Sequence, residues 1–308
     1  MIDGSSTVYP IHEAVAEEYI QSLRTADQGD EVRITIGVSG TGGGFEKFCR
    51  GEIDIAGASR PIKQIEIDRC AAAGVEFLEV PIAYDGIAVV VHPDNDWAHE
   101  ITVEELKRMY EPEAQGVINR WNQIRPEWPD RPLRVFGAGV DSGTYDYFTA
   151  AIVGKEHSSR GDFTSSEDDN VLVQGISRDV NAIGFFGYAY YEANRTLVRA
   201  LPLDNGSGAG PQAPTVEGIA DGTYQPLSRA MFIYVRKDKM EQPLLRQYID
   251  YYLNEGRPLM TEVGYVPLQD ATYGLAIERV SRGVVGSMLG GGGSKVGISL
   301  DDLMRETN

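Results

Sequence analysis

Two runs of apolar residues that lie far apart in the sequence place the strongest constraint on how this chain can fold. Residues Gly86–Val91 and Ala230–Val235 are almost continuously apolar and lack the alternation of a strand with one wet face. Such runs are typical of strands that are buried on both faces. We expect the first run to carry the chain from one lobe to another and the second to carry it back, so that the first lobe is discontinuous.

The length of the chain favours two lobes. Its 308 residues exceed the usual size of one domain and allow each of two lobes to bury its own core. We expect a first lobe of residues 1–85 plus 231–289, a second lobe of residues 86–230, and a glycine-rich linker with a C-terminal tail over 290–308. Because four consecutive glycines cannot belong to a stable helix, the tail from Lys295 to Asn308 is expected to be flexibly attached.

Around the two apolar runs the pattern alternates between helices and strands. Apolar side chains recur at every fourth position from Ile11 to Leu23, which predicts a helix over residues 10–24, and residues 32–36 alternate like a strand. Further helices are expected near 43–51, 63–73, 240–255 and 270–282, and further strands at 53–56 and 76–80. This rhythm predicts an α/β fold in which each lobe is a mixed sheet flanked by helices.

The charge balance excludes two classes of partner. With 28 Lys and Arg against 46 Asp and Glu, the formal net charge at pH 7 is -18. Nucleic acids and anionic membrane surfaces are bound by clustered basic residues, so we expect neither as a partner. An anion would have to be bound locally, by oriented dipoles and very few cations.

No apolar stretch approaches the roughly 18 residues that a membrane-spanning helix requires. The chain opens directly with Met1-Ile2-Asp3-Gly4. If the protein is secreted, this sequence is expected to be a mature form with an added Met.

Three short segments rich in Ser, Thr and Gly each precede a predicted helix, namely Gly4–Pro10, Ser39–Gly44 and Asp141–Thr144. The start of a helix offers unpaired backbone N–H groups and the positive end of its dipole, and Ser and Thr add hydroxyl donors. This combination suits a tetrahedral oxyanion. Ordinary helix capping explains any one segment taken alone, but three such segments together favour an anion site.

The glycines at 40–44 do not predict a nucleotide site. A Walker loop requires Gly-Lys followed by Ser or Thr, whereas Phe45-Glu46-Lys47 follows the glycines here. The Gly-x-Gly-x-x-Gly fingerprint of dinucleotide-binding folds is also missing after the first strand. Free phosphate is therefore better supported than a nucleotide.

Arg60, in the segment Gly57–Ile62 at the end of a predicted strand, is the obvious cation for such a site. A planar guanidinium can bind two phosphate oxygens at once. The alternative interpretation is a solvated surface arginine.

The sequence carries five segments that are highly specific in combination: Asp3–Pro10, Ser39–Phe45, Ile53–Ile62, Asp141–Phe148 and Ile183–Tyr190. Together they resemble the phosphate-binding proteins of high-affinity phosphate ABC importers, over roughly residues 3–285. The resemblance implies a class II periplasmic-binding-protein fold that holds inorganic phosphate between two lobes after hinge closure and delivers it to a membrane permease. It also implies a monomer without cofactor or catalysis, in the periplasm or another extracytoplasmic place, with lipid anchoring before processing left open.

By position, the resemblance implies phosphate ligands from both lobes. The first lobe would supply Ser6, Thr7, Val8 and Ser39 together with the cation Arg60, and the second lobe would supply Ser142, Gly143 and Thr144.

The carboxylate of the site is less determined. In the best-known pattern of the family an acid stands at the position of Arg60 and an arginine at the position of Ala138, so the charges look exchanged across the cleft. Asp141, or as second choice Asp146, would then supply the acid. An ionised carboxylate accepts the proton that phosphate keeps at neutral pH and repels sulfate, which keeps none. Helix N-capping explains Asp141 equally well.

Three rival functions remain, and for one of them, a role in surface adhesion, the sequence carries no evidence in either direction. The main rival within anion binding is another tetrahedral oxyanion, such as sulfate, arsenate or molybdate. A phosphate-ester hydrolase with Ser142 or Asp141 as nucleophile is less favoured, because the sequence lacks a Gly-x-Ser-x-Gly elbow and a His-Glu-x-x-His pair. No metal-ligand spacing links the histidines His12, His92, His99 and His157.

Cys49 and Cys70 are the only cysteines, too few for a thiolate metal cage. Both fall in predicted helices of the first lobe. The sequence fits either two free thiols or one disulfide.

Overall fold

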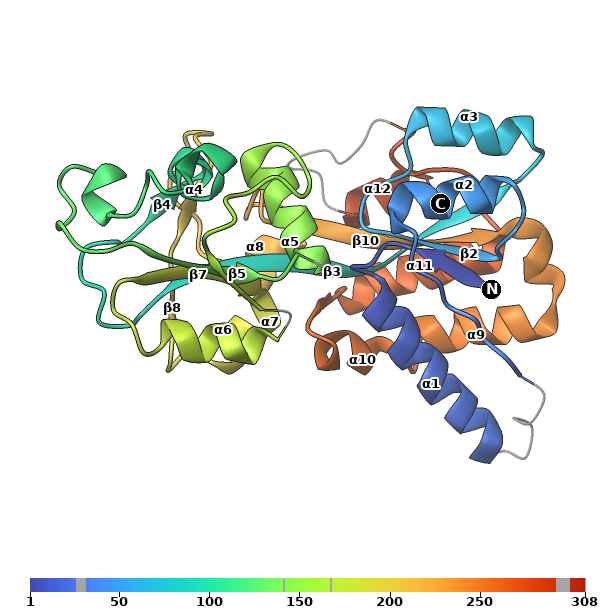
Figure 1. Cartoon of the computed structure of the whole chain (residues 1–308). Helices are drawn as coiled ribbons and strands as arrows, with labels where there is room; N and C mark the ends of the chain where they lie inside the picture. Colours follow the sequence, from blue (N-terminus) through green and yellow to red (C-terminus); the bar gives the residue numbers. More distant parts are fainter. Residues whose placement is uncertain (26–31, 141, 167, 292–299, 308) are drawn as a thin grey trace. The chain divides into compact units, whose positions relative to one another are not determined.

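The computed structural model of the chain describes residues 1–25, 32–140, 142–166, 168–291 and 300–307 (Figure 1). It divides into two compact units. Unit 1 comprises Met1–Tyr84 and Arg229–Asn308, and unit 2 comprises Asp85–Ser228. The chain passes from unit 1 to unit 2 within strand β3 (Phe77–Val91) and returns at the start of strand β10 (Ser228–Arg236).

Unit 1 is built on strands in the order β1, β2, β10 and β3. Strand β1 (Ile2–Gly4) runs parallel to β2 (Ile55–Ala58), β2 is antiparallel to β10, and the short β11 (Val266–Pro267) pairs with β3. The helices of unit 1 are α1 (Tyr9–Thr25), α2 (Gly40–Cys49), α3 (Gln64–Ala72), α9 (Pro243–Leu253), α10 (Arg257–Glu262), α11 (Asp270–Arg282) and α12 (Leu300–Thr307), with a 3-10 turn at Lys237–Glu241. In Figure 1, α2 and α3 cover one face of this sheet, and α1, α9 and α10 cover the other.

Unit 2 is built around the second half of β3. That half pairs antiparallel with β7 (Ala182–Gly187) and β8 (Arg199–Ala200), and β5 (Arg134–Ala138) lies parallel to both β7 and β6 (Thr164–Ser166). The remaining elements are β4 (Ile101–Thr102), β9 (Leu203–Asp204), α4 (Val103–Tyr110), α5 (Gly143–Phe148), α6 (Asp169–Ile176), α7 (Tyr188–Ala193) and α8 (Val216–Ala220), 3-10 turns at Pro112–Ala114 and Trp121–Gln123, and a π-helical turn at Thr149–Val153. The core includes Val90, Leu172, Ile176 and Phe186, all fully buried.

Strand β3 is longer than the sequence pattern suggests. Residues 76–80 and 86–91 were predicted as two strands, but the structure joins them into one strand of 15 residues, all of them buried. Pro81 and Gly86 weaken the strand pattern between the two runs. Burial on both faces outweighs this local preference, because strand formation depends strongly on packing context.

Two expectations for unit 1 are wrong. Residues 32–36 do not form a regular strand: Ile36 makes one isolated bridge to Ile2, because this segment lies half exposed at the edge of β1. The tail from Lys295 to Asn308 was expected to be flexibly attached, but its residues 300–307 form α12, which packs on α11. Residues 292–299 and 308, which hold the rest of the expected linker and tail, lie outside the described residues. Leu300 and Met304 lie one helical turn apart, and both are buried.

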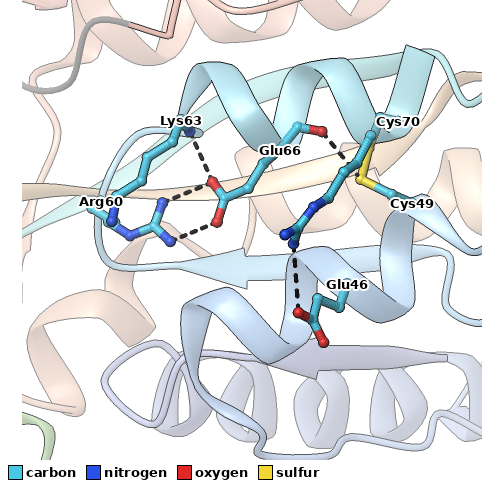
Figure 2. The surroundings of a disulfide bond; sticks show 7 residues. Glu46, Cys49, Arg60, Lys63, Glu66 and Cys70 are labelled. Atoms are coloured by element: carbon cyan, nitrogen blue, oxygen red, sulfur yellow. Dashed lines mark hydrogen bonds and ion pairs between the residues drawn. A yellow bond between two sulfur atoms is a disulfide. The ribbon is translucent and has the colours of Figure 1, made fainter. Parts of the chain in front are cut away.

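Cys49 at the end of α2 and Cys70 in α3 form a disulfide (Figure 2), which decides between the two states that the sequence left open. The bond joins two neighbouring helices of unit 1, and both cysteines are buried. Among the helices that the structure describes, none combines the length and the apolarity needed to cross a membrane.

The disulfide should contribute substantially to stability. Closing a loop with a sequence separation of 21 residues restricts the unfolded chain by an amount worth about 3 kcal/mol. We expect the double variant Cys49→Ala/Cys70→Ala to lose that much free energy of unfolding in urea denaturation. A reducing agent should lower the stability of the unmodified protein and leave the double variant unchanged. Equal stability of both proteins under oxidising conditions would contradict the prediction.

Candidate functional site

The first predicted segment follows strand β1 and leads into helix α1. Gly4 has a φ of +142°, and a Cβ on it would lie 2.2 Å from the carbonyl oxygen of Gly57, so only glycine allows β1 to approach β2 this closely. The Ser5 amide donates to that carbonyl at 2.9 Å. The chain therefore leaves the sheet in a fixed direction at the start of the segment.

Within this segment, several donors already have partners. The Ser5 hydroxyl oxygen accepts from the Thr7 amide at 3.2 Å, and the Val8 amide donates to the Ser5 carbonyl at 3.1 Å. Val8 is fully buried, Thr7 is buried and Ser6 is half-buried. To contact a ligand through its amide, Val8 would have to break the hydrogen bond from that amide to the Ser5 carbonyl. Of the three residues, Val8 therefore requires the largest local rearrangement to serve as a ligand.

The Thr7 side chain is held by a residue that sequence reasoning missed. Its hydroxyl oxygen accepts from Nη2 of Arg229 at 3.0 Å, and its carbonyl accepts from the Tyr265 hydroxyl at 2.6 Å. Because a guanidinium can only donate, the bond from Arg229 does not use the hydroxyl proton of Thr7. Thr7 can therefore donate that proton to an anion.

The second predicted segment lies at the start of α2. The Ser39 hydroxyl contacts Oδ1 of Asp3 at 2.5 Å, and Nζ of Lys47 lies 2.6 Å from Oδ2 of the same carboxylate. Burial acts to raise the pKa of the Asp3 carboxyl, but the hydrogen bonds from Lys47 and Ser39 and the charge of Lys47 outweigh it, so the pKa lies below its ordinary value. Nearby, Thr41 and Ser59 share a hydrogen bond of 3.2 Å between their hydroxyls.

Arg60 follows β2, as predicted, and is engaged within unit 1. Its Nη1 and Nη2 donate to the two carboxylate oxygens of Glu66 at 2.9 and 2.7 Å (Figure 2). Glu66 also accepts from the Lys63 amide at 2.8 Å, and the Arg60 guanidinium lies 5.6 Å from the centre of the Phe45 ring. The bidentate geometry expected for phosphate is thus used for Glu66, and whether Arg60 also serves an anion stays a prediction.

The third predicted segment begins α5 in unit 2. Ser142 is the N-cap residue, and its hydroxyl oxygen accepts from the Thr144 amide at 3.2 Å. Ser142, Gly143 and Thr144 are all half-buried. Asp141, the first choice for the carboxylate, lies outside the described residues. Asp146, the second choice, has Oδ1 at 3.1 Å from Nδ1 of His157.

The two units share one local arrangement. In Ser5-Ser6-Thr7 and in Ser142-Gly143-Thr144, the first hydroxyl oxygen accepts from the amide two residues later. The oxygen is thereby used as an acceptor, so each hydroxyl keeps its proton for a further acceptor. Both segments can therefore present hydroxyl donors at a helix start, which is the chemistry for binding an oxyanion.

Three residues of these surroundings escaped the sequence analysis: Asp3, Glu66 and Arg229. Asp3 directly precedes the first segment, and Glu66 lies six residues after Arg60. Closeness in the sequence was therefore the only indication, and a weak one, that either residue contacts a predicted ligand. Arg229 is far from Thr7 in the sequence, and only the return of β10 to unit 1 brings them together. In the parts of the chain that the structure describes, no group of three or more His, Cys, Asp or Glu is arranged to hold a metal ion.

Comparison with known proteins identifies the class first. Residues 1–255 match the model of the PBP superfamily domain, so the chain belongs to the periplasmic-binding-protein superfamily. A crystal structure of a possible phosphate binding protein from Planctomyces limnophilus is similar to this chain with a TM-score of 0.85 and 39% identity, over 92% of this chain and 97% of that one. The predicted α/β periplasmic-binding-protein fold is confirmed.

Two curated relatives identify the family within that class. The chain is 45% identical to the protein SphX of Synechocystis sp. over 99% of this chain and 88% of SphX. It is 34% identical to the phosphate-binding protein PstS of Staphylococcus saprophyticus over 88% of this chain and 81% of that protein. The chain belongs to the family of SphX and the PstS phosphate-binding proteins, as its resemblance predicted.

The Arg60–Glu66 pair should stabilise unit 1 measurably. The side chain of Glu66 is 8% exposed and that of Arg60 is 29% exposed. In Glu66→Gln the partly buried guanidinium of Arg60 loses its anionic partner, which should lower the free energy of unfolding by about 2 kcal/mol. A matched control is Glu46→Gln, because Glu46 and its partner Arg69 are both more than half exposed. Urea denaturation should show a loss of about 0.5 kcal/mol or less for that control. Similar losses in the two variants would contradict this account of Arg60.

Proposed function

We propose that this protein binds inorganic phosphate and delivers it to the permease of an ABC-type importer. The observation that carries the proposal is that the hydroxyl oxygens of Thr7, before α1, and of Ser142, at the start of α5, are both used as acceptors, so that each hydroxyl keeps its proton to donate. The names of the relatives support the same anion, because the Staphylococcus relative is a phosphate-binding protein and the Planctomyces structure is that of a possible one. The two units would act as the predicted lobes.

The proposed ligands are those that the sequence indicated. Hydroxyl and amide donors would come from Ser6, Thr7 and Val8 in unit 1 and from Ser142, Gly143 and Thr144 in unit 2, and Ser39 would contact the anion through its hydroxyl oxygen, whose proton is donated to Asp3. To these we add Arg229, whose bond to Thr7 leaves the proton of that hydroxyl available for phosphate. Arg60 would contribute positive charge beside these donors, with Glu66 fixing its position.

The choice of phosphate over sulfate requires an acceptor for the phosphate proton. We propose Asp141 or, as second choice, Asp146 for this role in unit 2. The contact between Asp146 and His157 gives Asp146 a partner of its own, which favours Asp141. An ionised carboxylate would repel a fully deprotonated anion.

The protein would act by binding alone, as a monomer without nucleic-acid partners. Its relatives are named for binding rather than for catalysis. We place it in the periplasm or another extracytoplasmic compartment, where a disulfide such as Cys49–Cys70 forms and persists. Lipid anchoring before processing belongs to the same proposal.

The first test is calorimetric titration of dialysed protein with phosphate and, separately, with sulfate at neutral pH. We expect one phosphate per chain and no heat from sulfate, because only phosphate carries a proton for the site. Binding of sulfate in place of phosphate, or no binding of either anion, would refute the proposed function. Turnover of a chromogenic phosphate ester would refute the proposal of binding without catalysis.

The proposed roles of Arg60 and Arg229 in phosphate binding can be tested by replacing each with the uncharged residue glutamine. Arg60→Gln and Arg229→Gln should each weaken phosphate binding by about tenfold or more, since each removes positive charge or donor orientation beside the anion. Arg50→Gln is the matched control, because Arg50 pairs with Glu52 at a surface where both side chains are at least half exposed. If Arg60→Gln binds phosphate as tightly as the control, Arg60 is only a structural partner of Glu66.

A further inference from the structure

The contact between Asp3 and Ser39 defines which partner holds the proton. The Asp3 carboxylate pairs with Lys47 at 2.6 Å, which favours its ionised form. An ionised carboxylate can only accept, so the hydroxyl of Ser39 must donate in the 2.5 Å bond between them. The single proton of Ser39 is thus directed into the protein.

A hydroxyl that already donates its only proton to another group can only accept a hydrogen bond from a ligand. Ser39 is exposed on unit 1, whereas Asp3 beneath it is 7% exposed. A ligand would therefore meet the lone pairs of the Ser39 oxygen and not a hydroxyl proton. This differs from the donor role that the sequence analysis assigned to Ser39.

The surroundings hold this polarity in place. The Ser39 amide donates to the Gly4 carbonyl at 3.1 Å, which fixes the backbone of Ser39 against β1. A Cβ on Gly37 would lie 2.5 Å from Oδ2 of Asp3, so glycine at this position makes room for the carboxylate. The Asp3 side chain therefore has the space to bridge Ser39 and Lys47.

We propose that Asp3 is a specificity-determining residue, which acts through Ser39 to make the site select an oxyanion that carries a proton. The proposal rests on the proposed function and deepens it. A P–OH group donates to the Ser39 oxygen, whereas every oxygen of sulfate would bring its lone pairs against those of Ser39. Unit 1 thereby supplies a proton acceptor of its own, in addition to any carboxylate of unit 2.

The substitution Asp3→Asn reverses the polarity with almost no change of shape. An amide has one oxygen, and the Lys47 cation, which can only donate, should attract that oxygen. The amide nitrogen then faces Ser39 and donates to its oxygen, so that the Ser39 proton turns toward the ligand. We expect the ratio of phosphate to sulfate affinity to fall by about tenfold or more, because sulfate gains a donor and phosphate loses an acceptor.

Lys47→Gln is the matched control. It removes the neighbouring charge, but the carboxylate of Asp3 still accepts from Ser39, so the affinity ratio should change by no more than about threefold. Calorimetric titration of the unmodified protein and of both variants with phosphate, without sulfate and with a large excess of sulfate as competitor, at one pH and one ionic strength, measures the ratio even where sulfate alone gives no heat. Ser39→Ala should also lower the ratio by removing the acceptor, and it serves as the test if Asp3→Asn does not fold.

Two outcomes overturn the inference. If Asp3→Asn weakens phosphate and sulfate binding equally, or leaves the ratio at that of Lys47→Gln, Asp3 only supports the fold. The proposed function would survive this result, since the unmodified protein would still bind phosphate. An unmodified protein that binds neither anion would refute both.

Discussion

The close approach of three glycines around strand β1 is the constraint on which the candidate site in unit 1 depends. A Cβ on Gly4 would lie 2.2 Å from the carbonyl oxygen of Gly57, and a Cβ on Gly44 would lie 2.6 Å from the Cα of Gly4. Strands β1 and β2 and helix α2 can therefore pack backbone against backbone. Since the first two Ser/Thr/Gly segments and Arg60 follow or begin these elements, their positions are fixed by main-chain contacts rather than by flexible side chains.

In unit 1, the attraction for an anion must come largely from dipoles, because acidic side chains neutralise nearby cations. Two of the cations near the candidate site residues of unit 1 are paired: Arg60 with Glu66, and Lys47 with Asp3. Such pairs add little net charge, so hydroxyl and amide dipoles must provide much of the attraction for an anion. Hydrogen bonds from oriented donors depend on the positions of the ligand oxygens, which gives selectivity for shape and protonation that a loose cluster of lysines would lack.

Much of the fold could be predicted from the sequence, because it follows from periodicity and burial. The helix over residues 10–24 and the apolar strands at 86–91 and 230–235 lie within α1, β3 and β10. The errors arose where packing overrides a local signal. Pro81 did not interrupt β3, residues 32–36 found only one bridge to β1, and Leu300 and Met304 brought the C-terminal helix onto α11 in spite of the glycines before it.

The candidate site was harder to predict, because residue type alone does not state which way a hydrogen bond runs. The Ser39 hydroxyl was expected as a donor to the ligand, but its proton is committed to Asp3. Arg60 was expected to face an anion, yet both terminal nitrogens of its guanidinium contact Glu66. For Thr7 the opposite holds, since Arg229 occupies its oxygen and leaves its proton to be donated.

These two hydroxyls therefore have opposite polarity in one unit. Thr7 can give a proton to a ligand, and Ser39 can only receive one. A ligand that satisfies both must carry at least one bare oxygen and at least one protonated oxygen. Near neutral pH, phosphate meets that requirement, and sulfate does not. Selectivity of this kind needs no ionised carboxylate in direct contact with the anion, so it avoids placing two negative charges side by side.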